Sequence, residues 1–77
     1  MWQDTKEGLY KNFEFTDFKQ AFAFMTKVAA VAEQEQHHPR WTNEWNKVEI
    51  WLSTHQADNK ITDKDRALAK AIDVLES

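Results

Sequence analysis

The chain contains three histidines, and each lies where one expected secondary-structure element gives way to the next. His37 and His38 are adjacent and precede the only proline, Pro39, whereas His55 follows a strand-like segment. Because unperturbed histidine titrates near pH 6.5, an imidazole can donate or accept a proton close to neutral pH without special tuning. The three side chains are therefore candidates for general acid and base catalysis.

Two acidic residues have spacings that relate them to these histidines. Glu33 precedes His37 by four residues, so a helix through both places them on one face. Pro39 disfavours helical dihedrals at the preceding residue and cannot continue a helix, so we expect the helix to end near His37. Asp65 follows Thr62 by three residues, which is the spacing of an acidic capping box at the start of a second helix.

The first of these helices is expected to begin just after Thr16, the predicted N-cap, with Asp17 adding negative charge to its first turn. Apolar residues recur at helical spacing over about five turns and predict one apolar face in the core. Phe24 and Val31 lie off this stripe, where they could meet a second surface. The stripe comprises Phe18, Ala21, Phe22, Met25, Val28, Ala29 and Ala32.

Strands are expected at 10–15, 40–45 and 47–53. The last segment alternates cleanly, with Val48, Ile50 and Leu52 facing one way. Asn46 tolerates left-handed dihedrals and suits the tight connection before this strand. Residues 1–8 are mostly polar and are expected to be a frayed or partly helical lead-in.

The second helix is expected to follow a loop at 56–61 and to bury one apolar face. That face comprises Ala67, Leu68, Ala71, Ile72 and Leu75. The resulting order, β-α-β-β-α, predicts the α+β class: a small antiparallel sheet of three to four strands with two helices packed on one face. Without a repeat or a linker, residues 1–77 form a single domain.

The composition limits the classes of function. The formal net charge is −3, and basic and acidic residues are mixed along the chain, so no basic stripe favours direct nucleic-acid binding. No apolar run approaches the roughly 20 residues of a membrane span, and the N-terminus is unlike a signal peptide. We expect a cytoplasmic protein that does not bind membranes.

The chain is small for its aromatic content. A domain of 77 residues buries only around 60% of the surface that its unfolded chain exposes, and the absence of cysteine excludes disulfides. The sequence nevertheless carries four tryptophans, five phenylalanines and one tyrosine. We therefore expect another copy of the chain to cover part of this surface in a homodimer or homotetramer.

Several of these residues form an ordered motif. Glu33-x-x-x-His37-His38-Pro39 is followed by Trp45, by Ser53-Thr54-His55 and by Asp65 at the start of a helix. In this order and spacing the motif resembles that of the pterin-4a-carbinolamine dehydratase family, which in animals doubles as the dimerisation cofactor of a homeodomain transcription factor. The resemblance covers about residues 9–75.

The resemblance implies an enzyme that dehydrates 4a-hydroxytetrahydropterin to quinonoid dihydropterin, in recycling of the cofactor used by aromatic amino-acid hydroxylases. It implies that His37 and His55 are the acid/base pair and that His38 mainly holds the pterin and assists. This chemistry needs no metal and no further cofactor.

The resemblance also implies a set of substrate-binding residues. Glu33 would orient an imidazole or hydrogen-bond the amino-pyrimidine edge of the pterin. Asp65 would cap the second helix and hydrogen-bond His55 or His38, although capping alone is an equally good explanation. Pro39 and Trp41 would shape the wall of the pocket.

The sequence departs from the family pattern at three places. Gln36 stands before the histidine pair, where the family often has aspartate, and the loop at 56–60 lacks the usual glycines and is one residue longer. The N-terminal segment is also short. These differences concern the loop and the surroundings of His37.

Two alternatives to the dehydratase remain open, a metal site and a binding module, and the tryptophans have an alternative role of their own. Glu33, His37 and His55 have the ligand types of a zinc site. The tryptophans at 41, 45 and 51 are better explained by packing or an interface than by stacking on a pterin. Finally, the protein could be a dimerisation or regulatory module that binds through the outer face of the second helix, where Ala69, Ala71 and Val74 extend the apolar surface.

Overall fold

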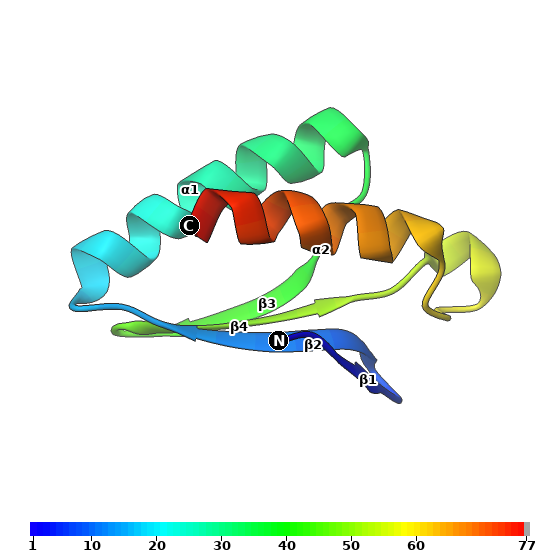
Figure 1. Ribbon diagram of the computed structural model, residues 1–77, viewed down its shortest axis with the longest axis horizontal. Helices are drawn as coiled ribbons and strands as arrows, with labels where there is room; N and C mark the ends of the chain where they lie inside the picture. Colours follow the sequence, from blue (N-terminus) through cyan, green and yellow to red (C-terminus); the bar gives the residue numbers. More distant parts are fainter. Residues whose placement is uncertain (77) are drawn as a thin grey trace.

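Two helices cover one face of a four-stranded antiparallel sheet (Figure 1). The computed structural model describes residues 1–76. In chain order the elements are β1 (Gln3–Thr5), β2 (Gly8–Glu14), α1 (Phe18–Glu35), β3 (Arg40–Glu44), β4 (Lys47–Leu52), the 3₁₀ turn η1 (His55–Ala57) and α2 (Asp63–Glu76). The predicted α+β class is confirmed. No helix within residues 1–76 is long and apolar enough to cross a membrane.

The strand order is β1-β2-β4-β3, so β4 lies between β2 and β3 in the interior of the sheet. The side chains of Val48, Ile50 and Leu52 are fully buried, which confirms the predicted alternation of this strand. Residues paired across antiparallel strands point to the same face. Trp41 pairs with Ile50 and therefore faces the helices, whereas Trp51 pairs with Arg40 on the opposite, open face.

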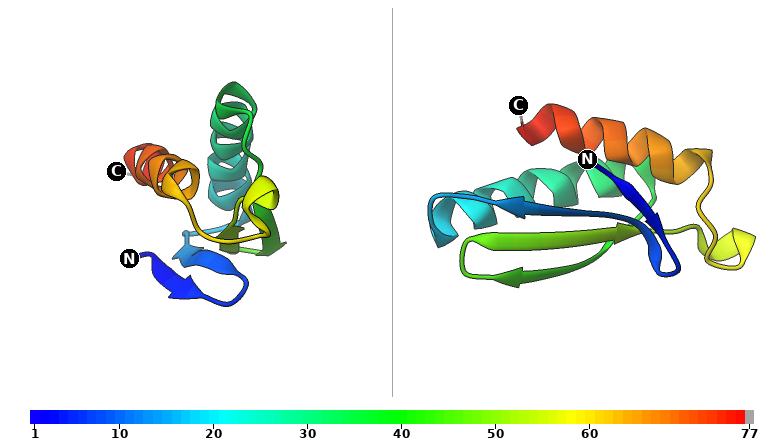
Figure 2. Two further views of the ribbon diagram at one scale, coloured as in Figure 1. Left: turned by 90° about the vertical axis from the view of Figure 1, so that its right-hand side faces the viewer. Right: turned by 60° about the horizontal axis from the view of Figure 1, so that its bottom comes forward.

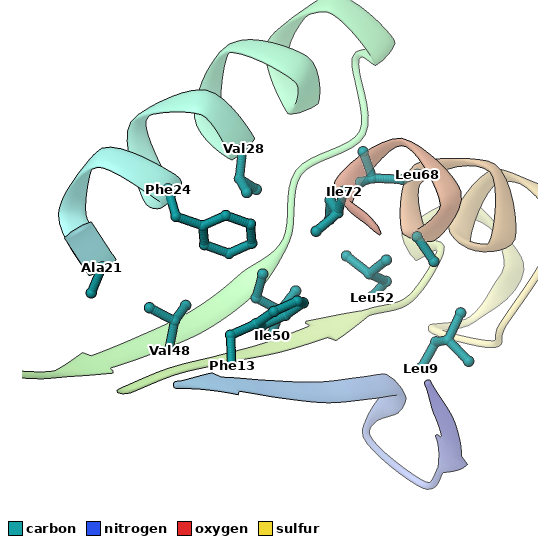
Figure 3. Packing of buried hydrophobic residues seen from close by; sticks show 11 residues of the cluster. Leu9, Phe13, Ala21, Phe24, Val28, Val48, Ile50, Leu52, Leu68 and Ile72 are labelled. Atoms are coloured by element: carbon teal, nitrogen blue, oxygen red, sulfur yellow. The ribbon is translucent and has the colours of Figure 1, made fainter. Parts of the chain in front are cut away.

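The core fills the space between the sheet and the two helices. Figure 3 shows Phe24 and Val28 of α1 above Phe13 and Ile50 of the sheet, with Ile72 of α2 beside them. The ring centroids of Phe13 and Phe24 lie 4.8 Å apart. This apolar layer holds both helices against β4, and the C-terminal end of that strand carries part of the candidate site.

Helix α1 is rotated relative to the predicted apolar stripe. Phe24, expected off the stripe, is buried, whereas Phe18 and Phe22 are 47% and 55% exposed and Ala29 is also exposed. The buried residues of the helix are Ala21, Phe24, Val28 and Ala32. The helix carries apolar residues over most of its circumference, so packing against Phe13 and Phe15, rather than periodicity, selected the buried face.

The predicted lead-in at 1–8 is wrong, because this segment forms β1 and the turn into β2. β2 consequently begins at Gly8, two residues earlier than expected. Gly8 has a φ of 128°, and a Cβ at this position would lie 2.4 Å from the carbonyl oxygen of Leu52. Only glycine allows this close approach of β2 to β4.

Two local predictions are also corrected. Asp17, not Thr16, is the N-cap of α1: its carboxylate accepts a hydrogen bond from the Gln20 N–H at 2.9 Å. In the turn between β3 and β4 the left-handed residue is Trp45, with a φ of 51°, rather than Asn46. The side chain of Asn46 instead donates a hydrogen bond to the Phe15 carbonyl at 2.9 Å, which ties the turn to the start of α1.

The predicted capping box of α2 is present. The Thr62 N–H donates to Oδ2 of Asp65 at 2.8 Å, and the Lys64 N–H donates to the Thr62 hydroxyl at 3.3 Å. Leu68 and Ile72 are fully buried as predicted. Ala67 was assigned to the core but is exposed, and the third buried apolar residue of this helix is Ala69.

Candidate active site

The segment after α1, the turn η1 and the start of α2 lie at the same end of the molecule, on the right in Figure 1 and toward the viewer in the left panel of Figure 2. The helix α1 ends at Glu35, and Gln36 adopts a left-handed conformation with a φ of 54°. The His37 N–H then donates to the Ala32 carbonyl at 3.1 Å, which completes the cap. Both histidines therefore lie beyond the helix.

This cap overturns the predicted pairing of Glu33 with His37 on one helical face. The left-handed turn at Gln36 redirects the chain, so the Glu33 carboxylate accepts a hydrogen bond from Nε2 of His38 at 2.8 Å. Both side chains of this pair are largely exposed. Glu33 thus orients an imidazole, but it orients the second histidine rather than the first.

His37 is held by α2 instead. Its Nε2–H donates to Oδ1 of Asp65 at 2.5 Å, and the Asp65 side chain is fully buried. The prediction that Asp65 would contact His55 or His38 is therefore wrong. The pairing connects residues 28 positions apart, which no local pattern in the sequence indicates.

The second oxygen of Asp65 is fixed as well. Its Oδ2 accepts hydrogen bonds from the Thr54 hydroxyl at 2.9 Å and from the Thr62 N–H at 2.8 Å. The two threonine hydroxyls also contact each other at 2.7 Å. Within residues 1–76 no buried side-chain nitrogen or oxygen is left without a partner. Asp65 thus serves both as the cap of α2 and as the anchor of His37.

His55 is the first residue of η1. The residues that follow, 56–61, were expected to form a loop. A backbone bridge between Thr54 and Lys60 closes this segment, and Asp58 and Asn59 adopt left-handed conformations at its tip. Asparagine and aspartate tolerate this region without glycine. Among the described residues, the His55 ring has no hydrogen bond or ion pair.

The three histidines border one cavity of about 320 Å³. Its lining comprises Gln36, His37, His38, Pro39, Arg40, Trp51, Ser53, His55 and Gln56. Pro39 lines this cavity, whereas Trp41, the other residue expected in the pocket wall, does not, because it faces the helices. Trp51, on the other face of the sheet, takes that place. Sequence analysis missed Trp51 and Arg40, although the alternation of β4 already separated Trp51 from the core.

A larger hollow of about 570 Å³ lies on the open face of the sheet. No histidine lines it, and its lining comprises Asn12, Phe13, Glu14, Thr42, Asn43, Glu44, Lys47 and Glu49. The smaller cavity is the better candidate for acid–base chemistry because the groups that can transfer protons near neutral pH surround it.

The expected alternative of a zinc site at Glu33, His37 and His55 finds no support in the geometry. Within residues 1–76 no group of three or more histidine, cysteine, aspartate or glutamate side chains is arranged to hold a metal ion. The carboxylate of Glu33 is engaged by His38 and that of Asp65 by His37. The arrangement instead suits proton transfer between imidazoles and a small molecule.

Comparison with known proteins identifies the family of this chain. The profile of the family described as "Pterin 4 alpha carbinolamine dehydratase" matches residues 1–75. Relatives from Christiangramia forsetii and Rhizorhabdus wittichii, each named "putative pterin-4-alpha-carbinolamine dehydratase", are 49% and 46% identical to this chain. These alignments cover 99% and 96% of this chain and 78% and 75% of the relatives.

Two solved structures share the fold. A transcriptional coactivator/pterin dehydratase from Brucella melitensis has a TM-score of 0.91 at 36% identity, with 99% of this chain and 82% of the other covered. A pterin dehydratase-like protein described as a RuBisCO assembly factor in the α-carboxysome has a TM-score of 0.81 at 27% identity, with 96% and 87% covered. The profile, the relatives and the fold together show that this chain belongs to the pterin-4a-carbinolamine dehydratase family.

Proposed function

We propose that this protein dehydrates 4a-hydroxytetrahydropterin to quinonoid dihydropterin by histidine acid–base catalysis. The observation that carries the proposal is the single cavity bordered by His37, His38 and His55. Membership of the family adds the substrate class. The reaction would take place in the cytoplasm, as part of tetrahydropterin recycling.

The reaction requires two proton transfers. The bond between the carbinolamine carbon and its hydroxyl breaks, and the hydroxyl leaves as water after an acid supplies a proton. A ring nitrogen gives its proton to a base, and its electrons form the new carbon–nitrogen double bond. Protons are conserved overall, so two imidazoles with opposite protonation states are sufficient.

We assign the two transfers to His37 and His55. Because the Nε2–H of His37 is donated to Asp65, its remaining nitrogen, Nδ1, is the one available for proton exchange with a ligand. The carboxylate also stabilises the imidazolium that forms when this ring accepts a proton. His55, which has no such anchor within residues 1–76, can adjust its orientation to the substrate.

The other residues assist. His38 borders the cavity and is oriented by Glu33, so it would hold the pterin. Asp65 is fully buried and does not line the cavity; its role is to position His37 rather than to bind substrate. Pro39 and Trp51 would form the wall of the pterin pocket. Trp41 is not proposed to bind substrate, because it faces the helices.

A stopped-flow dehydration assay on freshly generated 4a-hydroxypterin tests the proposal. We expect His37→Ala and His55→Ala each to lower turnover by about 10²–10⁴-fold, the usual contribution of a general acid or base. Lys47→Ala, which alters the hollow on the open sheet face, is the matched control and should retain turnover. Wild-type turnover in the double histidine variant would remove the mechanism.

A second candidate function is a binding module, and the exposed apolar residues of the helices favour it. They include Phe18 and Phe22 on α1, whose rings stack at 5.7 Å, and the 71% exposed Val74 on α2. The larger apolar surface is thus on α1 rather than on the expected second helix. We propose that a second copy covers it in a homo-oligomer; sedimentation showing only monomer at micromolar concentration would contradict this.

A further inference from the structure

The lining of the histidine cavity is unusual in its charge. It contains one permanent cation, Arg40, and three imidazoles, but no carboxylate. Glu33 and Asp65 do not line the cavity, although they accept hydrogen bonds from His38 and His37, which do. The wall of this cavity therefore lacks acidic side chains, although the chain as a whole has a formal net charge of −3.

Arg40 is held in place by an aromatic ring rather than by an acid. Its guanidinium carbon lies 4.6 Å from the ring centroid of Trp51, its cross-strand neighbour on β4. The Trp51 ring is itself 5.2 Å from the ring of Tyr10 on β2. A guanidinium stacked on an indole keeps its N–H donors at the edge of the plane, where they remain available to an acceptor.

The charge of Arg40 is also uncompensated. Within residues 1–76 it forms no ion pair with a carboxylate, whereas Arg66 pairs with Asp4 at 3.2 Å. The contrast with the hollow on the open sheet face is sharp, because three glutamates and one lysine line that hollow. The positive wall is therefore a local property of the histidine cavity and not of the whole sheet surface.

We infer that this site takes pterins whose side chain at ring carbon 6 carries an anionic group, and that Arg40 is the residue that selects them. A carboxylate or phosphate on that side chain would supply the acceptor that Arg40 lacks in the protein. The cavity volume of about 320 Å³ falls within the usual range for small-molecule sites. This inference depends on the proposed function, since it assumes that the cavity binds a pterin.

Calorimetric titration with two oxidised, stable pterins tests the inference. The probes are pterin-6-carboxylate and 6-hydroxymethylpterin, titrated at pH 7, where the pterin ring is mostly neutral and arginine keeps its charge. We expect the wild type to bind the carboxylate about tenfold more tightly, the size of one charge-assisted hydrogen bond. Arg40→Gln should abolish this preference, because it lowers the affinity for the carboxylate far more than the affinity for the uncharged pterin, whereas Arg66→Gln should behave as the wild type.

The outcomes separate the inference from the proposed function. Equal binding of both probes by the wild type, or a preference that survives in Arg40→Gln, overturns the role of Arg40 and leaves the dehydratase standing. If neither pterin binds and the dehydration assay also shows no turnover, the proposed function fails and the inference fails with it. A preference lost in Arg40→Gln but kept in Arg66→Gln establishes the inference.

Discussion

His37 and His38 are neighbours in the chain and make the same kind of contact, yet their surroundings are opposite. Each donates from Nε2 to one carboxylate oxygen, at 2.5 Å from Asp65 and 2.8 Å from Glu33. The side chains of the first pair are 11% and 0% exposed, and those of the second are 61% and 72% exposed. The two pairs have the same kind of hydrogen bond, but they therefore differ in how much they contribute to stability and to the orientation of each histidine.

The difference follows from solvation. Water competes for both partners of the exposed pair, so such a contact contributes little to stability and orients His38 only weakly. Around Asp65 no water competes, and a partner removed from it leaves polar groups unsatisfied in the interior. We conclude that His37 has a fixed orientation, suited to proton transfer, and that His38 can adapt to a ligand.

A third pair lies between these extremes. Lys11 of β2 donates to Asp73 of α2 at 2.9 Å, with side chains 16% and 44% exposed. The same carboxylate oxygen accepts the indole N–H of Trp2 at 3.0 Å. This cluster joins the first strands to the C-terminal helix, away from the histidine cavity. Substitutions in this cluster therefore test a pair of intermediate burial without disturbing the histidine cavity.

The largest effect is expected from Asp65→Ala. The change leaves the Thr62 N–H and His37 without their acceptor, and each unsatisfied buried group costs about 1–3 kcal/mol. The Thr54 hydroxyl loses Asp65 as well but keeps its contact with the Thr62 hydroxyl. We expect the free energy of unfolding to fall by about 3 kcal/mol or more, as measured by urea denaturation. Asp63→Ala, in the same helical turn but exposed, is the control. If Asp65→Ala lost no more stability than this control, the buried pair would not be the most important of the three.

Thr54→Val should have the next largest effect. Valine keeps the shape of threonine but removes the hydroxyl that fixes Asp65, at a cost of about 1–2 kcal/mol. Because Asp65 is the one side chain within residues 1–76 that binds the His37 ring, we also expect kcat to fall about tenfold with little change in KM. Thr54→Ser restores the hydroxyl and should recover kcat. Equal kcat in the valine and serine variants would show that Thr54 acts by packing alone.

Lys11→Met tests the intermediate pair and its pH dependence. Burial alone would lower the pKa of Lys11, but the hydrogen bond and charge of Asp73, together with Glu76, raise it above the ordinary value of 10.5. The folded protein thus binds this proton more tightly than the unfolded chain. Its stabilisation is fully present below about pH 10.5 and is lost as the pH rises through the higher folded-state pKa.

We expect Lys11→Met to cost about 1 kcal/mol at pH 8, since Asp73 is partly solvated. The difference from the wild type should shrink in urea denaturation at pH 11 and above. Tyr10 contributes a similar alkaline loss in both proteins, because its hydrogen bond to Glu49 raises the pKa of the phenol above 10.0. A difference that stays constant from pH 8 to alkaline pH would contradict the ion-pair explanation.

The smallest effect is expected from Glu33→Ala. Removing the partner of His38 should cost less than about 1 kcal/mol, because both side chains are well solvated. Turnover should fall only a few-fold, through weaker positioning of His38. A loss of stability comparable with that of Asp65→Ala would show that the two pairs contribute equally, and would contradict the explanation by burial.

The sequence by itself determined the features that depend on neighbours along the chain. The alternation of β4 identified Val48, Ile50 and Leu52 as buried, and Thr62 with Asp65 identified the start of α2. Pro39 placed the end of α1 within two residues. These are local consequences of side-chain geometry, and they were enough to give the α+β class. The three histidines of the candidate site came from the ordered motif and its resemblance to the family.

Only the tertiary structure decided which side chains meet. A left-handed turn at Gln36 exchanged the expected partner of Glu33, and the packing of α1 on Phe13 chose its buried face. Asp65 reaches His37 across 28 residues. Such pairings depend on the relative placement of helices and strands, which the packing of the common core sets and no local spacing encodes.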